Sequence, residues 1–277
     1  MLVNIAKVIH DEDKAIEWLI EKGLLKRYDR CIYCNYDHIG MVKDNCYRCH
    51  RCKKEWSIRK DSILYGLRIP FTKFIMALKL FELEIPVLKA SKELGLSYTT
   101  THKIYQLIRE KIYDYCSKDD VLQGEVEIDE AYFGGKSKGK RGRGSNNKIP
   151  VFGILERNGK VKVEIVKDVK AETILRETIK KVKRGSIIYT DKYKGYDTLV
   201  LYGFKHERID KSIRFANGRV YINGIEGFWS YAKERLLRYH GVSKELFPYY
   251  LKELEFRYNN RDDVFDKMIE VLVGNNG

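Results

Sequence analysis

Three carboxylates, Asp129, Asp191 and Glu226, are the side chains of this 277-residue chain best suited to carry out chemistry. Asp129 ends the alternating segment 125–129 and Asp191 follows the short apolar run 187–190, so both are predicted to lie on strands. Glu226 lies in a segment with helical periodicity. Two strand acids and one helix acid can converge on a pair of divalent metal ions, which is how many enzymes cut phosphodiester bonds.

The helix that carries the third acid is predicted from an apolar stripe formed by Ile225, Trp229 and Ala232. Lys233 falls two turns beyond Glu226 on the same helix. Oxygen ligands suit Mg²⁺ or Mn²⁺, and magnesium is typically held by few protein groups together with substrate phosphate. Acids alone therefore suffice, and no Ser/His/Asp constellation, glycine-rich phosphate loop or H-E-x-x-H motif offers competing chemistry.

The charge of the chain indicates a polyanionic partner. Lys and Arg number 53 against 39 Asp and Glu, which gives a formal charge of 53 − 39 = +14. Hydrophobic residues at 44% and aromatic residues at 12% are enough for a packed core, so disorder does not explain the charge. No run of about eighteen apolar residues and no cleavable leader are present, which predicts a soluble, cytoplasmic protein without a membrane partner.

Five of the six cysteines lie between Cys31 and Cys52, in clustered C-x-x-C pairs. In a cytosolic chain this spacing favours Zn²⁺ over disulfides, and a closed, tetrahedral structural site would stabilise a module this small. The predicted ligands are Cys31, Cys34, Cys49 and Cys52. Spacing alone leaves Cys46 and His50 as alternative ligands, whereas the isolated Cys116 is interpreted as a small apolar residue.

The N-terminal half is predicted to be helical around the cysteine segment. An opening helix is capped by Asp13 and ends before Gly23, and a later helix begins after Pro70. Residues 89–94, the turn Gly95-Leu96 and a helix capped by Ser97 then predict a helix-turn-helix. Its second helix leaves polar residues facing outward, which suits a DNA groove. The candidate DNA contacts on it are Thr99, Thr100 and Lys103.

The segment 136–148 is basic and rich in glycine, without one acidic residue. Because it follows the Asp129 strand, we interpret it as a phosphate clamp rather than a solvated loop. The candidate contacts there are Lys136, Lys138, Lys140, Arg141 and Arg143.

The remaining chain predicts an α/β layer fold. Strands are expected from 124 to 133, 151 to 156 and 161 to 166, with an Asn-Gly hairpin turn between the last two. A helix over 172–182 should lead to the Asp191 strand, followed by a short helix near 196–199 and a strand over 206–209. The Glu226 helix and one further helix complete the predicted order of elements. Three strands, a helical crossover and a further strand, with helices on the faces of the sheet, describe an α/β layer fold.

Four motifs follow one another along this part of the chain: Glu-Ile-Asp-Glu-Ala-Tyr-Phe-Gly-Gly at 127–135, Tyr-Thr-Asp-Lys-Tyr-Lys-Gly-Tyr at 189–196, Asn-Gly-Ile-Glu-Gly-Phe-Trp-Ser at 223–230 with Lys233, and Glu-Phe-Arg-Tyr-Asn-Asn-Arg at 255–261. With them the chain resembles prokaryotic DDE insertion-sequence transposases, more narrowly the zinc-ribbon group related to the eukaryotic Merlin elements. The interval 226 − 191 = 35 also matches the usual separation of the second and third acids. The resemblance covers nearly the whole chain.

The resemblance implies a ribonuclease-H-like catalytic domain that uses Mg²⁺ to nick double-stranded DNA at element ends and joins the freed 3′-hydroxyl to target DNA. It implies a homodimer or larger synaptic assembly and a nucleoid-associated location. Asp129 and Asp191 match the first two acids, and Glu226 the third. Asn223, one helical turn earlier, is the alternative, because some relatives carry asparagine as the third residue. Lys233 matches a lysine expected to meet phosphate or DNA, while Tyr221 stands where many relatives have histidine.

Only the resemblance ranks Asp129 above Glu127, because both acids share one face of the predicted strand while Glu130 alternates to the other. Three regions are expected: a helix and zinc ribbon over 1–66, a helix-turn-helix-like DNA-binding region over 67–118, and the catalytic domain over 119–277. Two other functions compete with transposition. One is a structure-selective nuclease of the same fold, and the other is a DNA-binding regulator whose catalysis has lapsed.

Overall fold

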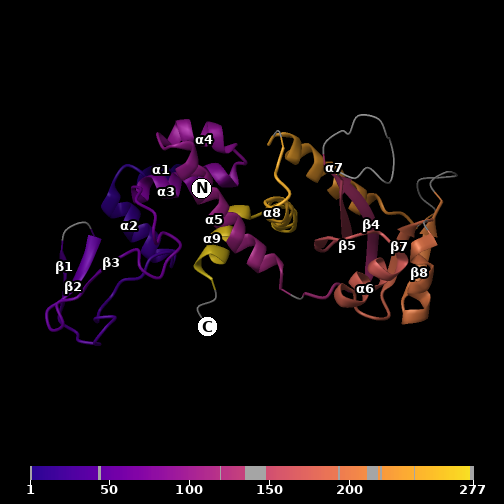
Figure 1. Ribbon diagram of the computed structural model, residues 1–277, viewed down its shortest axis with the longest axis horizontal. Coiled ribbons are helices and arrows are strands. Elements are labelled where there is room, and N and C mark those ends of the chain that lie inside the picture. The colour runs from indigo at the N-terminus through magenta and orange to yellow at the C-terminus, as the bar shows by residue number, and fades with distance from the viewer. Residues whose placement is uncertain are drawn as a thin grey trace. The chain divides into compact units, whose positions relative to one another are not determined.

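The computed structural model describes residues 2–42, 45–118, 120–134, 148–192, 194–210, 218, 220–239 and 241–274 (Figure 1). The chain divides into two compact units. Unit 1 comprises Met1–Lys111 together with Asp263–Gly277, and unit 2 comprises Ile112–Asp262. Among the described residues, no helix is both long enough and apolar enough to span a lipid bilayer.

Unit 1 is mainly helical. Its helices are α1 (Leu2–Val8), α2 (Glu12–Glu21), α3 (Phe71–Glu82), α4 (Val87–Leu94), the first part of α5 (Tyr98–Cys116) and α9 (Val264–Val273). The predicted cap of the opening helix was wrong. Asp11 caps α2, because its extended backbone lets its carboxylate accept the N–H groups of Asp13 at 2.8 Å and Lys14 at 3.1 Å. Asp13 lies in the first turn instead, where its negative charge meets the positive end of the helix dipole.

The helix-turn-helix has the predicted elements. Gly95 ends α4 in the left-handed conformation, with φ +57°, and the Ser97 hydroxyl oxygen accepts the Thr100 N–H at 3.1 Å. Phe81 of α3 packs edge-on against Tyr105 of α5. Helix α9 also packs on α3. The division into three functional regions stays a prediction. The structure differs from it at the C-terminus, because residues 263–277 belong to unit 1 and not to the unit that contains the predicted catalytic acids.

The cysteine module of unit 1 is a small antiparallel sheet in the order β1-β2-β3. Its strands are β1 (Ile39–Val42), β2 (Cys46–Cys49) and β3 (Glu55–Ser57). The module's core contains Tyr47 and Trp56, whose rings stack with centroids 5.7 Å apart, and Tyr28 meets both rings edge-on. Strands this short bury little apolar surface, so this sheet needs an additional source of stability.

Unit 2 is built on a five-stranded sheet in the order β6-β5-β4-β7-β8. Its strands are β4 (Glu125–Phe133), β5 (Ile149–Glu156), β6 (Val161–Ile165), β7 (Ile187–Asp191) and β8 (Lys205–Ile209). The first three form an antiparallel meander, and β7 and β8 run parallel to β4. Helix α6 (Ala171–Lys181) makes the crossover to β7. This topology confirms the predicted α/β, ribonuclease-H-like fold.

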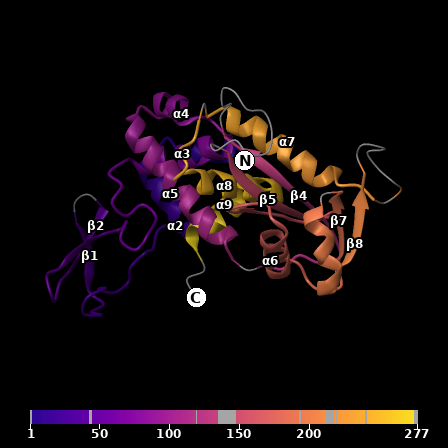
Figure 2. The ribbon, with the colours of Figure 1, turned by 45° about the vertical axis from the view of Figure 1, so that its right-hand side comes forward.

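Helices cover both faces of the sheet, because the side chains of each strand alternate between two hydrophobic clusters. Helices α7 (Asn223–Leu237) and α8 (Phe247–Asn259) cover the face that carries Val151 and Val163. Helix α6 and the 3₁₀ helix η2 (Lys194–Tyr202) cover the face that carries Val126 and Ile128. Figure 2 shows α7 and α6 on opposite sides of the strands. An acid on β4 therefore faces either α7 or η2, according to its position in the alternation.

Helix α8 closes one edge of this sheet with side-chain hydrogen bonds. Asn259 accepts the Val161 N–H through Oδ1 at 2.7 Å and donates from Nδ2 to the Val161 carbonyl at 2.8 Å. At Val163, the N–H donates to Glu255 Oε2 at 2.9 Å and the carbonyl accepts from Lys252 Nζ at 2.7 Å. Helix α8 thus satisfies the outward backbone groups of these two residues on the edge strand β6. This explains the 255–261 motif, at least in part, as an attachment of the helix to the sheet.

Replacement of Asn259 by alanine is expected to destabilise unit 2 by about 2 kcal/mol, because both backbone groups of Val161 lose their partner. Chemical denaturation followed by circular dichroism would measure the loss. Asn260→Ala is the matched control, since among the described residues that side chain donates to the Phe256 carbonyl of its own helix and to no strand, and it should cost less than half as much. Equal effects of the two substitutions would contradict the edge-closing role.

Candidate active site

Asp129 and Asp191 lie on adjacent parallel strands at matching positions. The pairing of β4 with β7 runs from Glu125 opposite Ile187 to Glu127 opposite Tyr189, and each aspartate lies two residues beyond that last pair. Both aspartates are half-buried, and the alternation places them on the face that α7 covers. Side chains at matching positions of neighbouring strands stand side by side. The structure therefore brings together the two predicted strand acids.

A buried phenol lies within the electrostatic reach of both aspartates. Tyr196 of η2 is fully buried, and its hydroxyl donates to Glu130 Oε2 at 2.6 Å. Burial raises the pKa of Tyr196 well above its ordinary value, and the negative charges of Glu130, Asp129 and Asp191 raise it further. The phenol consequently stays protonated and holds Glu130, the acid that alternates to the opposite face from Asp129, in a fixed place.

Glu226 lies in the first turn of α7, on the flank that faces away from α8. On the other flank, Phe228 and Tyr231 pack against Tyr258 of α8, with ring centroids 5.2 and 5.7 Å apart. Successive helical residues rotate by about 100°, so Glu226 lies roughly 160° around the axis from Phe228. Since α8 packs on the edge strand β6, and β5 and β4 lie between β6 and β7, Glu226 is on the side of α7 toward Asp191.

A glycine on the neighbouring strand allows α7 to lie close above the acids. Gly153 of β5 pairs directly with Asp129, and a Cβ atom built there would lie only 2.3 Å from Cζ2 of Trp229. Any larger residue would force the indole, and with it the first turns of α7, away from the sheet. Lys233 is exposed one turn beyond Trp229, and Asn223 is exposed at the first position of the helix.

The three carboxylates come from adjoining elements but do not form a tight cluster. In the described part of the chain, one group of three or more cysteine, histidine or carboxylate side chains has all its ligand atoms within 4.8 Å of one another. That group consists of the four cysteines. Like charges repel when no cation lies between them, so three ionised carboxylates on adjoining elements are not expected to approach further by themselves.

Glu127, the competing acid on β4, has a different position and partners. It is 1% exposed, its Oε1 accepts from Arg157 Nε at 3.1 Å, and its Oε2 accepts from the Ile225 N–H at 3.0 Å. Both carboxylate oxygens are thus engaged inside the protein, which distinguishes Glu127 from the half-buried Asp129. Sequence reasoning missed Arg157 altogether. The sequence signal that could have indicated it is the row of acids at 125, 127 and 129 on one strand face, because buried acids require a nearby cation.

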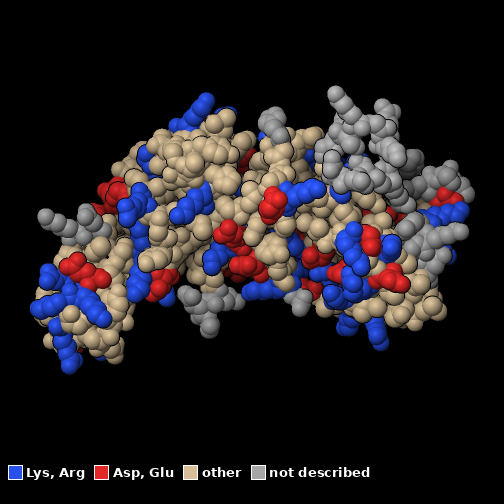
Figure 3. All heavy atoms as spheres, in the orientation of Figure 1, with Lys and Arg blue, Asp and Glu red and all other residues tan. Residues whose placement is uncertain are grey.

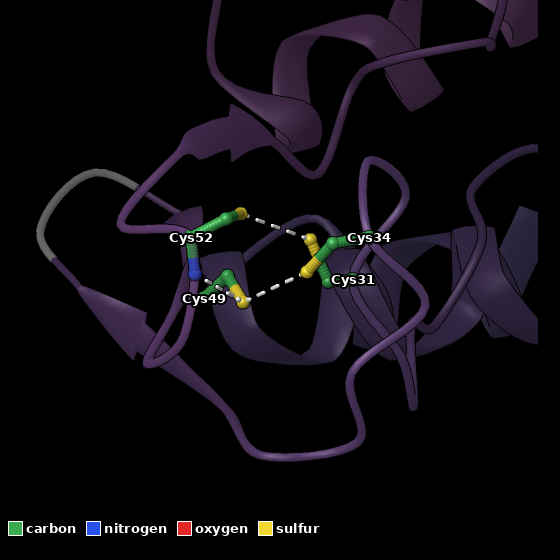
Figure 4. Close-up of side chains that lie close together, drawn as sticks. All are labelled: Cys31, Cys34, Cys49 and Cys52. Carbon is green, nitrogen blue, oxygen red and sulfur yellow. Dashed lines mark hydrogen bonds between the residues drawn. The ribbon is translucent and has the colours of Figure 1, made fainter.

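The four predicted metal-ligating cysteines come together in unit 1 (Figure 4). The Sγ atoms of Cys31 and Cys52 are 3.6 Å apart, as are those of Cys34 and Cys49. Such a cluster could hold a metal ion. Cys46 and His50 lie outside it, and His50 stacks on His38 with ring centroids 4.2 Å apart. The competing pair, Cys46 and Cys49 in the other C-x-x-C spacing, is therefore not the one that the fold adopts.

Backbone groups prepare one of these thiols to bind a cation. The N–H groups of Arg51 and Cys52 each donate to Cys49 Sγ at 3.4 Å. Burial acts to raise the pKa of Cys49, but these donors and the neighbouring thiols together lower it to about 6. The thiolate, which is the form that binds metal, is favoured at neutral pH as a result.

Comparison with known families identifies the larger part of unit 2. Residues 121–259, just over half of the chain, match the model of the ISXO2-like transposase domain. The chain belongs to the ISXO2-like transposase family. The matched range contains all three candidate acids and the α8 residues that close the sheet edge, so it coincides with the fold described for unit 2.

Two relatives of this ISXO2-like transposase come from mobile or transposase-like sequences. An uncharacterized transposase-like protein of Haemophilus influenzae is 45% identical over 103 residues, which cover 37% of this chain and 84% of the relative. An uncharacterized protein in transposable element ISH50 of Halobacterium salinarum is 25% identical over 230 residues, covering 76% of this chain and 77% of the relative.

Solved structures similar to the transposase include the Mos1 strand transfer complex and a pre-cleavage Mos1 transpososome. The first is 13% identical, with a TM-score of 0.29 over 73% of this chain and 74% of that chain. The second is 12% identical, with a TM-score of 0.31 over 73% and 75%. These scores are too low to add to the family assignment.

The predicted DNA contacts of the transposase divide between surface positions and undescribed ones. On α5, Thr99 and Lys103 are exposed, whereas Thr100 is half-buried and its hydroxyl lies 2.8 Å from that of Ser97. The basic contacts predicted at Lys136, Lys138, Lys140, Arg141 and Arg143 lie outside the described residues. Figure 3 shows further Lys and Arg side chains gathered over the cysteine module. Exposed basic residues of that module are Arg48, Arg51, Lys53 and Lys54.

Proposed function

We propose that this ISXO2-like transposase binds the ends of an insertion sequence, nicks the DNA and transfers the freed 3′-hydroxyl into target DNA. Asp129, Asp191 and Glu226 are the acids of the reaction. The observation that supports this best is the matching placement of Asp129 and Asp191 on adjacent parallel strands, beneath the helix that carries Glu226. The two strand acids lie on one face of the sheet, on β4 and β7. The helix acid lies on α7, which packs on that face.

The donor set of this site fits magnesium or manganese, because it consists of carboxylate oxygens, which hard divalent cations prefer. Asp129 and Asp191 would be the strand ligands and Glu226 the helix ligand. Cations bound there would activate the attacking oxygen and stabilise the leaving oxygen of the phosphodiester. Asn223 stays the alternative third residue. It is exposed at the first position of α7, whereas Glu226 is half-buried on the side of α7 toward the two aspartates.

Other residues would hold the DNA. Lys233 lies two turns beyond Glu226 on α7 and would contact a phosphate near the cleaved bond. Thr99, Thr100 and Lys103 would contact the element end, and the basic segment 136–143 would clamp the backbone. The formal charge of +14 supports a nucleic-acid partner. Joining two element ends to one target also requires two active sites, so a homodimer or larger assembly is expected.

Zn²⁺ is the cation proposed for the cysteine module. Four thiolates in a closed site are the donor set of structural zinc, and the N–H donors at Cys49 are typical of the turns that bind it. Metal binding would supply the stability that three short strands lack.

A cleavage and joining assay tests the proposed function. The purified chain, Mg²⁺ and DNA carrying the element's own ends with flanking sequence would be incubated with a target plasmid. Nicking at the element boundary followed by joining to the plasmid is the expected result. Nicking without joining would favour the nuclease of the same fold, and binding without nicking would favour the regulator. The half-buried acids at all three positions are retained in this chain, which favours the active enzyme.

A further inference from the structure

We infer that Arg157 is the positioning residue that sets the mutual placement of the three acids, an inference that rests on the proposed function. Arg157 follows β5 directly, in the turn that leads to β6. It does not belong to any of the four motifs that carry the family resemblance. Its importance follows from what its guanidinium group contacts.

The guanidinium contacts three other segments of unit 2. Its Nη1 donates to Glu125 Oε2 at 2.7 Å and its Nε donates to Glu127 Oε1 at 3.1 Å, both on β4. Its Nη2 donates to the Tyr221 carbonyl at 2.7 Å, just before α7. The rings of Tyr189 on β7 and of Tyr221 pack against it, with the guanidinium carbon 3.7 and 3.9 Å from their centroids.

Each contacted element carries a candidate acid a short distance further along the chain. Glu127 precedes Asp129 by two residues on the same strand face, and Tyr189 precedes Asp191 in the same way. On the third element, Glu127 Oε2 accepts the Ile225 N–H at 3.0 Å, directly before Glu226. A rigid contact one or two residues from each acid fixes the backbone from which that acid extends.

An arginine suits this positioning role better than any other positively charged side chain. Its planar group provides five donors in a fixed geometry and can pack against aromatic faces at the same time, whereas a lysine provides one compact charge. The Arg157 side chain is 9% exposed and Glu127 is 1% exposed, so water screens their interaction little. Glu127 without its guanidinium partner would be a buried carboxylate beside a second one, Glu125, and would be expected to move.

The contacts also place the N-terminus of α7. The Glu127 carboxylate lies at the positive end of that helix, where it accepts a backbone N–H that has no partner within the helix. Tyr221 contributes both its carbonyl and its ring to the same guanidinium group. Loss of Arg157 would therefore let α7 tilt over the sheet, and Glu226 would move relative to Asp129 and Asp191.

The test measures metal binding rather than activity alone. Arg157→Lys keeps the charge but cannot make the three directed donations, so we expect it to fold and to bind Mn²⁺ about 10- to 100-fold more weakly than the parent protein. Electron paramagnetic resonance of free Mn²⁺ during a titration would give the affinity. The Mg²⁺ concentration for half-maximal DNA cleavage should rise in parallel. DNA affinity without metal should stay within about twofold.

Two variants control this experiment. Arg176→Lys alters an exposed arginine on α6 that pairs with Glu177, and it should bind Mn²⁺ like the parent protein. Glu125→Gln removes one charge partner at a side chain that is 35% exposed, so it should fold even if Arg157→Lys does not, and its Mn²⁺ affinity should fall by several-fold. Parent-like Mn²⁺ affinity in folded Arg157→Lys would overturn the inference. If that variant does not fold, parent-like affinity in Glu125→Gln would overturn it instead.

Failure of the proposed function would look different. Asp129→Asn is expected to lose both Mn²⁺ binding at the acids and DNA cleavage. If Asp129→Asn binds Mn²⁺ and cleaves DNA normally, the assignment of the acids is wrong, whatever Arg157→Lys does. If Asp129→Asn loses both and Arg157→Lys loses neither, the acids are correctly assigned and Arg157 does not position them.

Discussion

Replacement of Asp191 by asparagine is expected to reduce both DNA nicking and strand joining by roughly 10³-fold or more, equivalent to about 4 kcal/mol of transition-state stabilisation. Asparagine has the same shape as aspartate but lacks the negative charge that holds a divalent cation. Asp191 is half-buried at the end of β7 and beside the position of Asp129, so the substitution removes one of two adjacent strand ligands. Both steps should fail together, because one site performs both.

Binding and folding should be unaffected by Asp191→Asn. Fluorescence anisotropy with labelled element-end DNA in the presence of Ca²⁺ would report affinity, and gel assays with Mg²⁺ would report nicking and joining. Asp262→Asn, at an exposed position, is the matched control and should retain full activity. Asp129→Asn combined with Asp191→Asn should be little worse than either alone, because the acids act as a unit. Activity that survives in Asp191→Asn would show that this aspartate is not a ligand of the catalytic cation.

Removal of metal from the cysteine module is expected to unfold β1, β2 and β3. Structural zinc contributes about 10–16 kcal/mol of apparent binding free energy in small modules, far more than three short strands can supply. Cys49→Ser should therefore lose the ion and expose Trp56, which is 4% exposed in the folded module. The emission of that tryptophan should shift to longer wavelength, and limited proteolysis should cut within residues 31–57. Native mass spectrometry would count the bound zinc.

Cys46→Ser is the matched control for the zinc prediction. Cys46 lies on β2, three residues before Cys49, but its sulfur is outside the cluster of four. This variant should keep one zinc ion per chain and an unshifted emission spectrum. Loss of zinc from Cys46→Ser with retention in Cys52→Ser would show that the ion uses the other pair, Cys46 and Cys49.

Local patterns predicted the elements of unit 2 because those elements have regular periodicity. The alternation of 125–133, the Asn-Gly turn at 158–159 and the apolar stripe beside Glu226 each correspond to an observed strand, turn or helix. The four cysteines predicted as ligands also meet, although spacing alone left Cys46 and His50 as alternatives. These signals are local in the chain, so neighbouring residues are enough to define them.

Features that depend on distant partners could not be predicted in the same way. The role of Arg157 carries no local signal, since its partners lie 30 to 64 positions away in the sequence. The capping of α2 by Asp11 rather than Asp13 depended on which of two nearby aspartates adopts extended backbone. The attachment of α9 to unit 1 depends on packing against α3, for which its sequence carries no directional signal. Tertiary contact decides the cases of Arg157 and α9, whereas local backbone conformation decides the cap of α2.

The closed edge of the sheet restricts how copies of this transposase can associate. In the described part of unit 2, β6 and β8 are the two outer strands, and the side chains of Lys252, Glu255 and Asn259 already occupy backbone groups of β6. A second protomer therefore cannot extend the sheet by strand addition at β6, and charged Lys205, Glu207 and Arg208 disfavour such growth at β8. Protomers should instead meet through helical surfaces or through DNA that both of them hold, which leaves each catalytic sheet a separate body.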